Sequence, residues 1–173
     1  MSTTTIDDQL DEIRRRIDGL QARVRPDASR SRRHLDELRR AEAAVRAAVR
    51  QAPDEVDERL AQLRTRLDVA EHSLEADASD DWAAFAAAVE AELHSWDTYL
   101  ERLQTSVAAR AWKAREQAEA AIGDVRSRRI AVGERLAQVR DSAGDGSQDA
   151  RERITAARDE LEEKAAELST KLN

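Results

Sequence analysis

The sequence predicts an all-α protein built from elongated antiparallel helical hairpins of the coiled-coil type. Charged residues make up 38 % of the 173 positions and aromatic residues only 3 %, a composition typical of long helices and coiled coils. Apolar residues recur at alternating spacings of three and four, which places them along one face of a helix. Only two prolines and five glycines interrupt the chain.

Residues 1–77 are expected to form an N-terminal segment of three helices, at about 6–24, 27–51 and 54–76. Thr5 and Asp8 have the spacing of a capping box at the start of the first helix. Pro26 removes a backbone donor and restricts the residue before it, so the first helix ends there. Pro53 stands where a first helical turn tolerates proline, and it opens the third helix.

Residues 78–173 are expected to form one very long central helix, at about 80–141, and an antiparallel return helix, at about 147–172. Ser79 is the predicted N-cap of the long helix. A single helix of this length would reach about 90 Å. The heptad spacing slips between Val107 and Ala111, and a break near Gly123 is the alternative that the sequence leaves open.

The long helix carries the strongest apolar pattern in the chain, and this pattern predicts an interaction seam. Because a narrow stripe on a protruding helix needs a partner, part of it must pack against the helices of residues 1–77 or against a second copy; we expect self-association, with a dimer favoured. We call the following residues the apolar seam: Trp82, Val89, Leu93, Trp96, Leu100, Leu103 and Val107.

The two parts of the chain resemble each other. Val45 matches Val132 and Val49 matches Leu136 at an offset of 87 residues, whereas Leu60 matches Ile154 at an offset of 94. The seven-residue difference preserves the heptad phase. An internal duplication is therefore a hypothesis that the sequence raises.

Residues with catalytic or ligand-binding potential are scattered. The chain has no cysteine, and His34, His72 and His94 lie far apart. Residues 141–152 have the length of an EF-hand loop, but Ala143 replaces a carboxylate ligand at position 3, so we interpret this segment as a plain Asp/Gly-rich turn. We therefore expect no metal, no cofactor and no enzymatic activity.

The net charge of the chain limits the kinds of partner that it can bind. The net charge of −7 disfavours bulk attraction to nucleic acid. The segment 23–40 is locally basic, with seven arginines against three acidic residues. It could contact phosphates or anionic lipid, although acidic helices of the same protein would serve equally well. Neither a signal peptide nor a membrane-spanning run is recognisable, so a cytoplasmic location is expected.

Two resemblances add to this interpretation. The run from Trp96 to Leu103, a glycine turn near Gly144 and the Asp159-Glu160-Leu161 triplet resemble small bacterial coiled-coil proteins of a stress-response family, over about residues 93–172. This resemblance implies an intracellular helical protein of unknown molecular activity, and it transfers no functional residue. The run from Pro53 to Leu60 is similar to the proline-punctuated amphipathic repeats of exchangeable apolipoproteins.

We therefore expect a non-enzymatic coiled-coil scaffold or adaptor, related to stress, that acts through self-association and charged helical faces. The alternative is a reversible lipid-surface binder with apolipoprotein-like helices. The narrow seams favour the scaffold, because interfacial helices present broad apolar faces to lipid.

Overall fold

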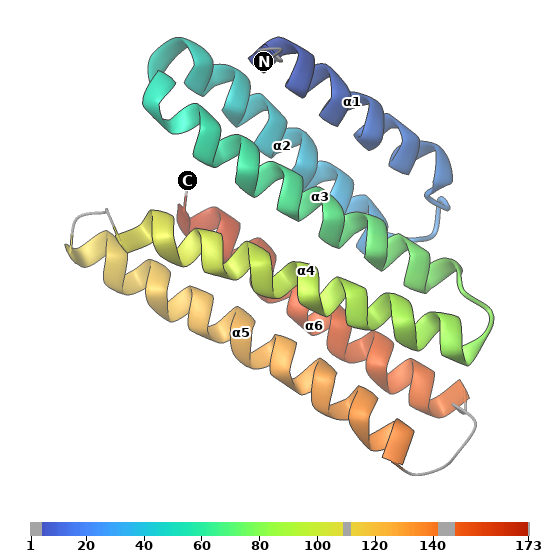
Figure 1. Ribbon diagram of the computed structural model, residues 1–173. Helices are drawn as coiled ribbons and strands as arrows, with labels where there is room; N and C mark the ends of the chain where they lie inside the picture. The colour runs from blue at the N-terminus through green and yellow to red at the C-terminus, as the bar shows by residue number, and fades with distance from the viewer. Residues whose placement is uncertain (1–4, 109–111, 142–147, 173) are drawn as a thin grey trace.

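The computed structural model describes residues 5–108, 112–141 and 148–172. Over these residues the chain forms six α-helices, one short 3-10 turn and no strand (Figure 1). The prediction of an all-α protein is therefore confirmed. The elements are α1 (Ile6–Arg23), α2 (Ser29–Gln51), η1 (Pro53–Glu55), α3 (Val56–Ala78), α4 (Trp82–Ala108), α5 (Trp112–Asp141) and α6 (Gln148–Leu172).

Local signals set the first helix boundaries. The Thr5 hydroxyl accepts a hydrogen bond from the Asp8 backbone N–H, and the Asp8 carboxylate accepts one from the Thr5 backbone N–H. This is the predicted capping box. Helix α1 ends at Arg23, before Pro26, and Pro53 opens the 3-10 turn that leads into α3.

The predicted N-cap of the helix after residue 80 is wrong. Ser79 closes α3, and its hydroxyl donates to the Glu75 carbonyl at 2.7 Å. The side chain of Asp81 takes the capping role instead and accepts from the Ala84 backbone N–H at 3.0 Å. The physical reason is position: α4 begins at Trp82, so only the residue directly before it can reach the free N–H groups of the first turn.

The helices form two units of three, each around its own apolar core. Helices α1, α2 and α3 enclose one core, and α4, α5 and α6 enclose the other. Helices α3 and α4 form an antiparallel pair at the centre, α2 lies behind α3, and α6 lies behind α4 (Figure 1). Val69 and Ala76 of α3 reach into the second core and link the two units.

The prediction of one very long central helix is wrong. Helices α4 and α5 lie side by side, and Arg129 of α5 reaches back to Asp97 of α4 at 2.6 Å (Figure 1). The longest helix, α5, has 30 residues and runs through Gly123 without a break. The chain reverses between α4 and α5 because folding back buries apolar side chains that a protruding helix would leave in water. Burying each large one contributes about 1.5–3 kcal/mol.

The apolar seam lies inside the chain. Six of its seven members are 0–4 % exposed, and Trp82 is half-buried. They pack in the second core against residues of α5 and α6, such as Val125 and Leu161. Our expectation that the seam would join two copies is therefore wrong, because a three-helix unit already covers the stripe from two sides.

The internal duplication stays a hypothesis. Val45 and Val132 are both buried, as are Leu60 and Ile154. Val49, however, is 37 % exposed, unlike its proposed counterpart.

Candidate functional site

A layer of ionisable side chains lies buried between the two three-helix units. Its members come from α2, α3, α4 and α6, and each is no more than 6 % exposed. Charged side chains are almost never this buried unless they are paired. We call the following side chains the ionic layer: Arg30, His34, Arg66, Glu92, Arg158 and Glu162.

Arg158 of α6 ties three helices together. Its Nε donates to Oε2 of Glu92 in α4 at 2.8 Å, and its Nη1 donates to Oδ1 of Asp77 in α3 at 2.9 Å. Its Nη2 donates to the backbone carbonyl and the hydroxyl of Ser73 at 3.1 and 3.0 Å. The fork geometry of arginine makes such simultaneous pairing achievable.

Arg30 connects α2 to both units. Its Nη1 donates to Asp77 at 2.7 Å and its Nε to Asp159 of α6 at 2.9 Å. Asp77 thereby accepts from two arginines, Arg30 and Arg158. The pairing fixes how far α2 and α6 can slide past each other.

Arg66 of α3 makes the second buried bridge. Its Nη2 lies 2.6 Å from Glu37 Oε2 and 2.9 Å from Glu162 Oε2. Its guanidinium carbon lies 4.5 Å from the centre of the Trp96 ring, within the range of a cation–π contact. The seam residue Trp96 therefore takes part in the layer as well as in the core.

Burial shifts two members of the layer in opposite directions. The pKa of His34 lies well below its usual value because of burial and the positive charges of Arg66 and Arg30, so the ring is neutral. The pKa of Glu92 is raised by burial, against the opposing effect of Arg158. Nε2 of His34 lies 3.2 Å from Oε1 of Glu162, but neither ring nitrogen makes a hydrogen bond within the described residues.

The layer joins helices of both units through buried ion pairs. Buried ion pairs add little net stability, but removing one partner leaves a costly unpaired charge. Among the residues that the structure describes, no three histidine or acidic side chains are grouped as metal ligands. The candidate EF-hand-like segment cannot be compared, since residues 142–147 lie outside the described residues.

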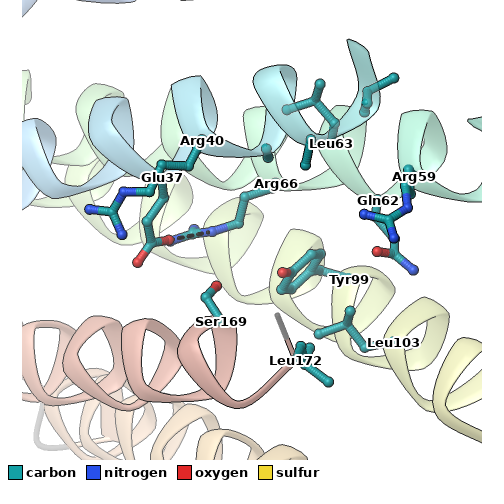
Figure 2. A pocket seen from close by; sticks show the side chains of 13 residues that line it. Glu37, Arg40, Arg59, Gln62, Leu63, Arg66, Tyr99, Leu103, Ser169 and Leu172 are labelled. Carbon is teal, nitrogen blue, oxygen red and sulfur yellow. Dashed lines mark hydrogen bonds and ion pairs between the residues drawn. The ribbon is translucent and has the colours of Figure 1, made fainter. Parts of the chain in front are cut away.

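A pocket lies at the edge of the ionic layer, toward the carboxyl end of α6 (Figure 2). It is a half-open cavity of about 130 Å³ between α2, α3, α4 and α6. Apolar side chains, including Val45, Leu63 and Leu103, share its wall with Arg40, Arg66 and other polar groups.

The outer surface of α2 is strongly basic. Among the seven arginines of the basic segment 23–40, only Arg30 is buried. Arg39 donates to Gln21, and the other four arginines of this surface make no hydrogen bond or ion pair with the described residues. Asp36 is the one acidic residue among them. We call the following exposed residues the arginine face: Arg32, Arg33, Arg39, Arg40 and Arg50.

The outer surface of α6 is acidic. Glu160 pairs with Arg128 and Glu167 with Lys164, whereas Glu163 has no partner among the described residues. One arginine, Arg153, lies among them. We call the following exposed residues the acidic face: Asp149, Glu152, Glu160, Glu163 and Glu167.

Sequence reasoning found the apolar seam and the basic segment but missed the ionic layer. A signal was present: Glu92 and Arg158 directly adjoin the apolar positions Leu93 and Ala157. If only a narrow seam were covered, Glu92 and Arg158 would lie in solvent. They are buried because several helices cover α4 and α6.

The fold and these surfaces define an all-helical protein of two three-helix units joined through an ionic layer. None of the described helices combines the length and apolar character that crossing a bilayer requires. No protein-family model, curated protein or solved structure matches this chain.

Proposed function

We propose that the protein is a non-enzymatic scaffold or adaptor, and that its charged helical faces join two copies into a dimer. The observation that carries the proposal is the presence of complementary faces on neighbouring helices of one chain. The arginine face extends over about 27 Å of α2 at 1.5 Å per residue. The acidic face runs along α6 beside it, since Arg30 of α2 bonds to Asp159 of α6.

Helices α2 and α6 run in the same direction. Near their amino-terminal ends Arg30 bonds to Thr155 and Asp159, and near their carboxyl-terminal ends Val45 and Leu172 line one pocket. Both helices lie on the same side of the molecule, behind α3 and α4 (Figure 1). A second copy that packs against this side contacts the arginine face and the acidic face at the same time.

Symmetry selects one arrangement of the two copies. A two-fold axis parallel to the helices places α2 of one copy on α6 of the other, so opposite charges meet twice. An axis perpendicular to the helices would place arginine on arginine. Because a closed two-fold dimer has no freedom to slide along its axis, the register within the chain also holds between the chains.

The alignment of α2 with α6 predicts which charged residues of the two copies meet. Arg30 is offset from its α6 partners by 125 and 129 residues. The same offsets place Arg33 of one copy level with residues 158–162 of the other, within one turn of Glu163. Arg40 comes level with residues 165–169, beside Glu167.

Paired charge reversals test the proposal. Arg33→Glu alone and Glu163→Arg alone each replace two attractions by two repulsions. A surface ion pair contributes about 0.2–1 kcal/mol, so we expect the dissociation constant of the dimer to rise about tenfold or more. Mixing the two variants restores both contacts, and sedimentation should detect a heterodimer where neither variant self-associates.

Matched controls are available on α4. Glu101→Arg and Arg102→Glu reverse exposed charges away from both faces, and neither side chain has an ion pair among the described residues. These variants should dimerise like the parent. A parent that stays monomeric at high micromolar concentration, or variants that fail to complement each other, would contradict the dimer.

The lipid-surface alternative has weaker support. Leu60, Leu63 and Leu67, which would have to face lipid, are 0–2 % exposed. Within the described chain, the large hydrophobic side chains that are exposed are Val49 and Ile130. An interfacial helix buries a broad apolar face. Co-sedimentation with anionic vesicles at physiological salt, lost when these leucines are made polar, would instead favour lipid binding.

A further inference from the structure

The pocket beside the ionic layer has the chemistry of a binding site for a small amphiphilic anion. Side chains of four helices line it, and they divide into two kinds (Figure 2). Val45, Leu63 and Leu103 are buried, at 1–2 % exposure, and supply an apolar wall. Ala41 and Ala44 of α2 leave the room that larger side chains would fill.

The polar part of the lining carries excess positive charge. Three arginines, Arg40, Arg59 and Arg66, line the pocket together with a single carboxylate, Glu37. Most of this charge is already engaged: Arg66 bridges two glutamates, and Arg59 donates to Glu55 at 2.7 Å. Arg40 makes no hydrogen bond or ion pair with the described residues. Within one copy it is therefore the cation left to bind a ligand, whereas in the proposed dimer it also lies beside Glu167 of the other copy.

Tyr99 adds a neutral donor. Burial raises the pKa of its hydroxyl, which is hydrogen-bonded to Ser169, so the group stays protonated at neutral pH. In Figure 2 its ring lies between Arg66 and Leu103, at the meeting point of the polar and apolar parts of the wall. A ligand with one charged end and one apolar end fits this division.

We propose that this pocket binds a small monocarboxylate with a short apolar body. The carboxylate would pair with Arg40, and the apolar body would contact Leu63 and Leu103. The size is consistent: a cavity of about 150 Å³ accommodates benzene, and this one has about 130 Å³. An aromatic ring or a chain of about six carbons matches that volume. The proposal goes beyond self-association and does not depend on it, and the two share one side chain, Arg40.

The experiment uses hexanoate as the probe, with hexanol and hexylamine as the neutral and cationic analogues. Ligand-observed NMR and calorimetry on the full chain should show hexanoate binding at least tenfold more tightly than either analogue. Arg40→Gln should reduce hexanoate to the affinity of hexanol, because only the charge contact is lost. Arg50→Gln is the matched control and should bind like the parent. Arg50 is an exposed arginine of the same helix outside the pocket, with no ion pair among the described residues.

A second variant tests the apolar part. Ala44→Leu fills the cavity and should abolish binding of all three compounds, while circular dichroism verifies that the helices are retained. Arg33→Glu, which weakens the proposed dimer, should bind hexanoate normally, so the two proposals can fail separately. Equal affinity for the three compounds, no binding of hexanoate, or unchanged binding by Ala44→Leu would overturn the inference.

Discussion

Arg158 is the most informative single side chain in the structure. Replacing it by methionine keeps a similar volume but removes the positive charge from a site that is 0 % exposed. Glu92, itself 1 % exposed, would lose its counter-charge at 2.8 Å, and the Ser73 carbonyl would lose a donor. Breaking a buried pair in this way costs about 3–5 kcal/mol.

The expected loss is large enough to measure in two ways. For a chain of this size, 1 kcal/mol corresponds to about 2–4 °C in melting temperature, so Arg158→Met should lower it by about 6–20 °C. Urea unfolding followed by circular dichroism should show the same loss of free energy. The double variant Arg158→Met/Glu92→Met should recover most of it, because Asp77 retains Arg30 and no unpaired charge remains.

A matched control separates charge burial from helix effects. Arg153→Met makes the same substitution at an exposed position of α6 and should change stability by less than about 0.5 kcal/mol. If Arg158→Met is as stable as the parent, the ionic layer does not hold the two units together. If the double variant is less stable than the single one, the unpaired Glu92 is not the cause of the loss.

Two further predictions concern other side chains of the core. Trp96→Ala should lower the free energy of unfolding by about 3–5 kcal/mol, measured by thermal melting. Trp82→Ala, at a half-buried site, should lower it by less, and equal losses would contradict the difference in burial. Trp96→Ala should leave the dissociation constant of the dimer unchanged. Because folded His34 stays neutral while the unfolded form binds a proton below its ordinary pKa of 6.5, the parent should lose up to about 1.4 kcal/mol per pH unit below that value. Urea titrations between pH 7 and 5 should show a flatter profile for His34→Leu, and identical profiles would refute the assignment. Glu92 acts in the opposite sense, since its raised pKa favours the folded state as the pH falls, so the comparison must be made between variants.

The two charged faces show why charge patterns need a tertiary context. The basic segment was visible in the sequence, and partner helices of the same protein were an equal explanation for it. In the structure Arg30 does find such partners, in Asp77 and Asp159. Among the residues that the structure describes, Arg32, Arg33 and the other members of the arginine face have no acidic partner. Which arginine is paired depends on its angular position around α2, relative to α3 and α6.

The apolar seam illustrates the same limit. Its spacing correctly identified Val89, Trp96 and Leu103 as residues that must be buried. The pattern could not tell whether a second copy or the same chain would cover them. A heptad stripe is satisfied by any partner helix of matching shape, and the chain itself supplied two, α5 and α6.

The sequence by itself determined the helical class and several boundaries, because these depend on contacts between residues close in the chain. The Thr5–Asp8 capping box, the end of α1 before Pro26 and the turn at Pro53 are of this kind. Only the tertiary structure decided the reversal between α4 and α5 and the burial of Arg66, Glu92 and Arg158. Those features depend on residues 29 to 96 positions apart. A buried charge is neutralised only where helices of both units place opposite charges beside each other. The local periodicity of the sequence does not show how the two units are aligned along their helices.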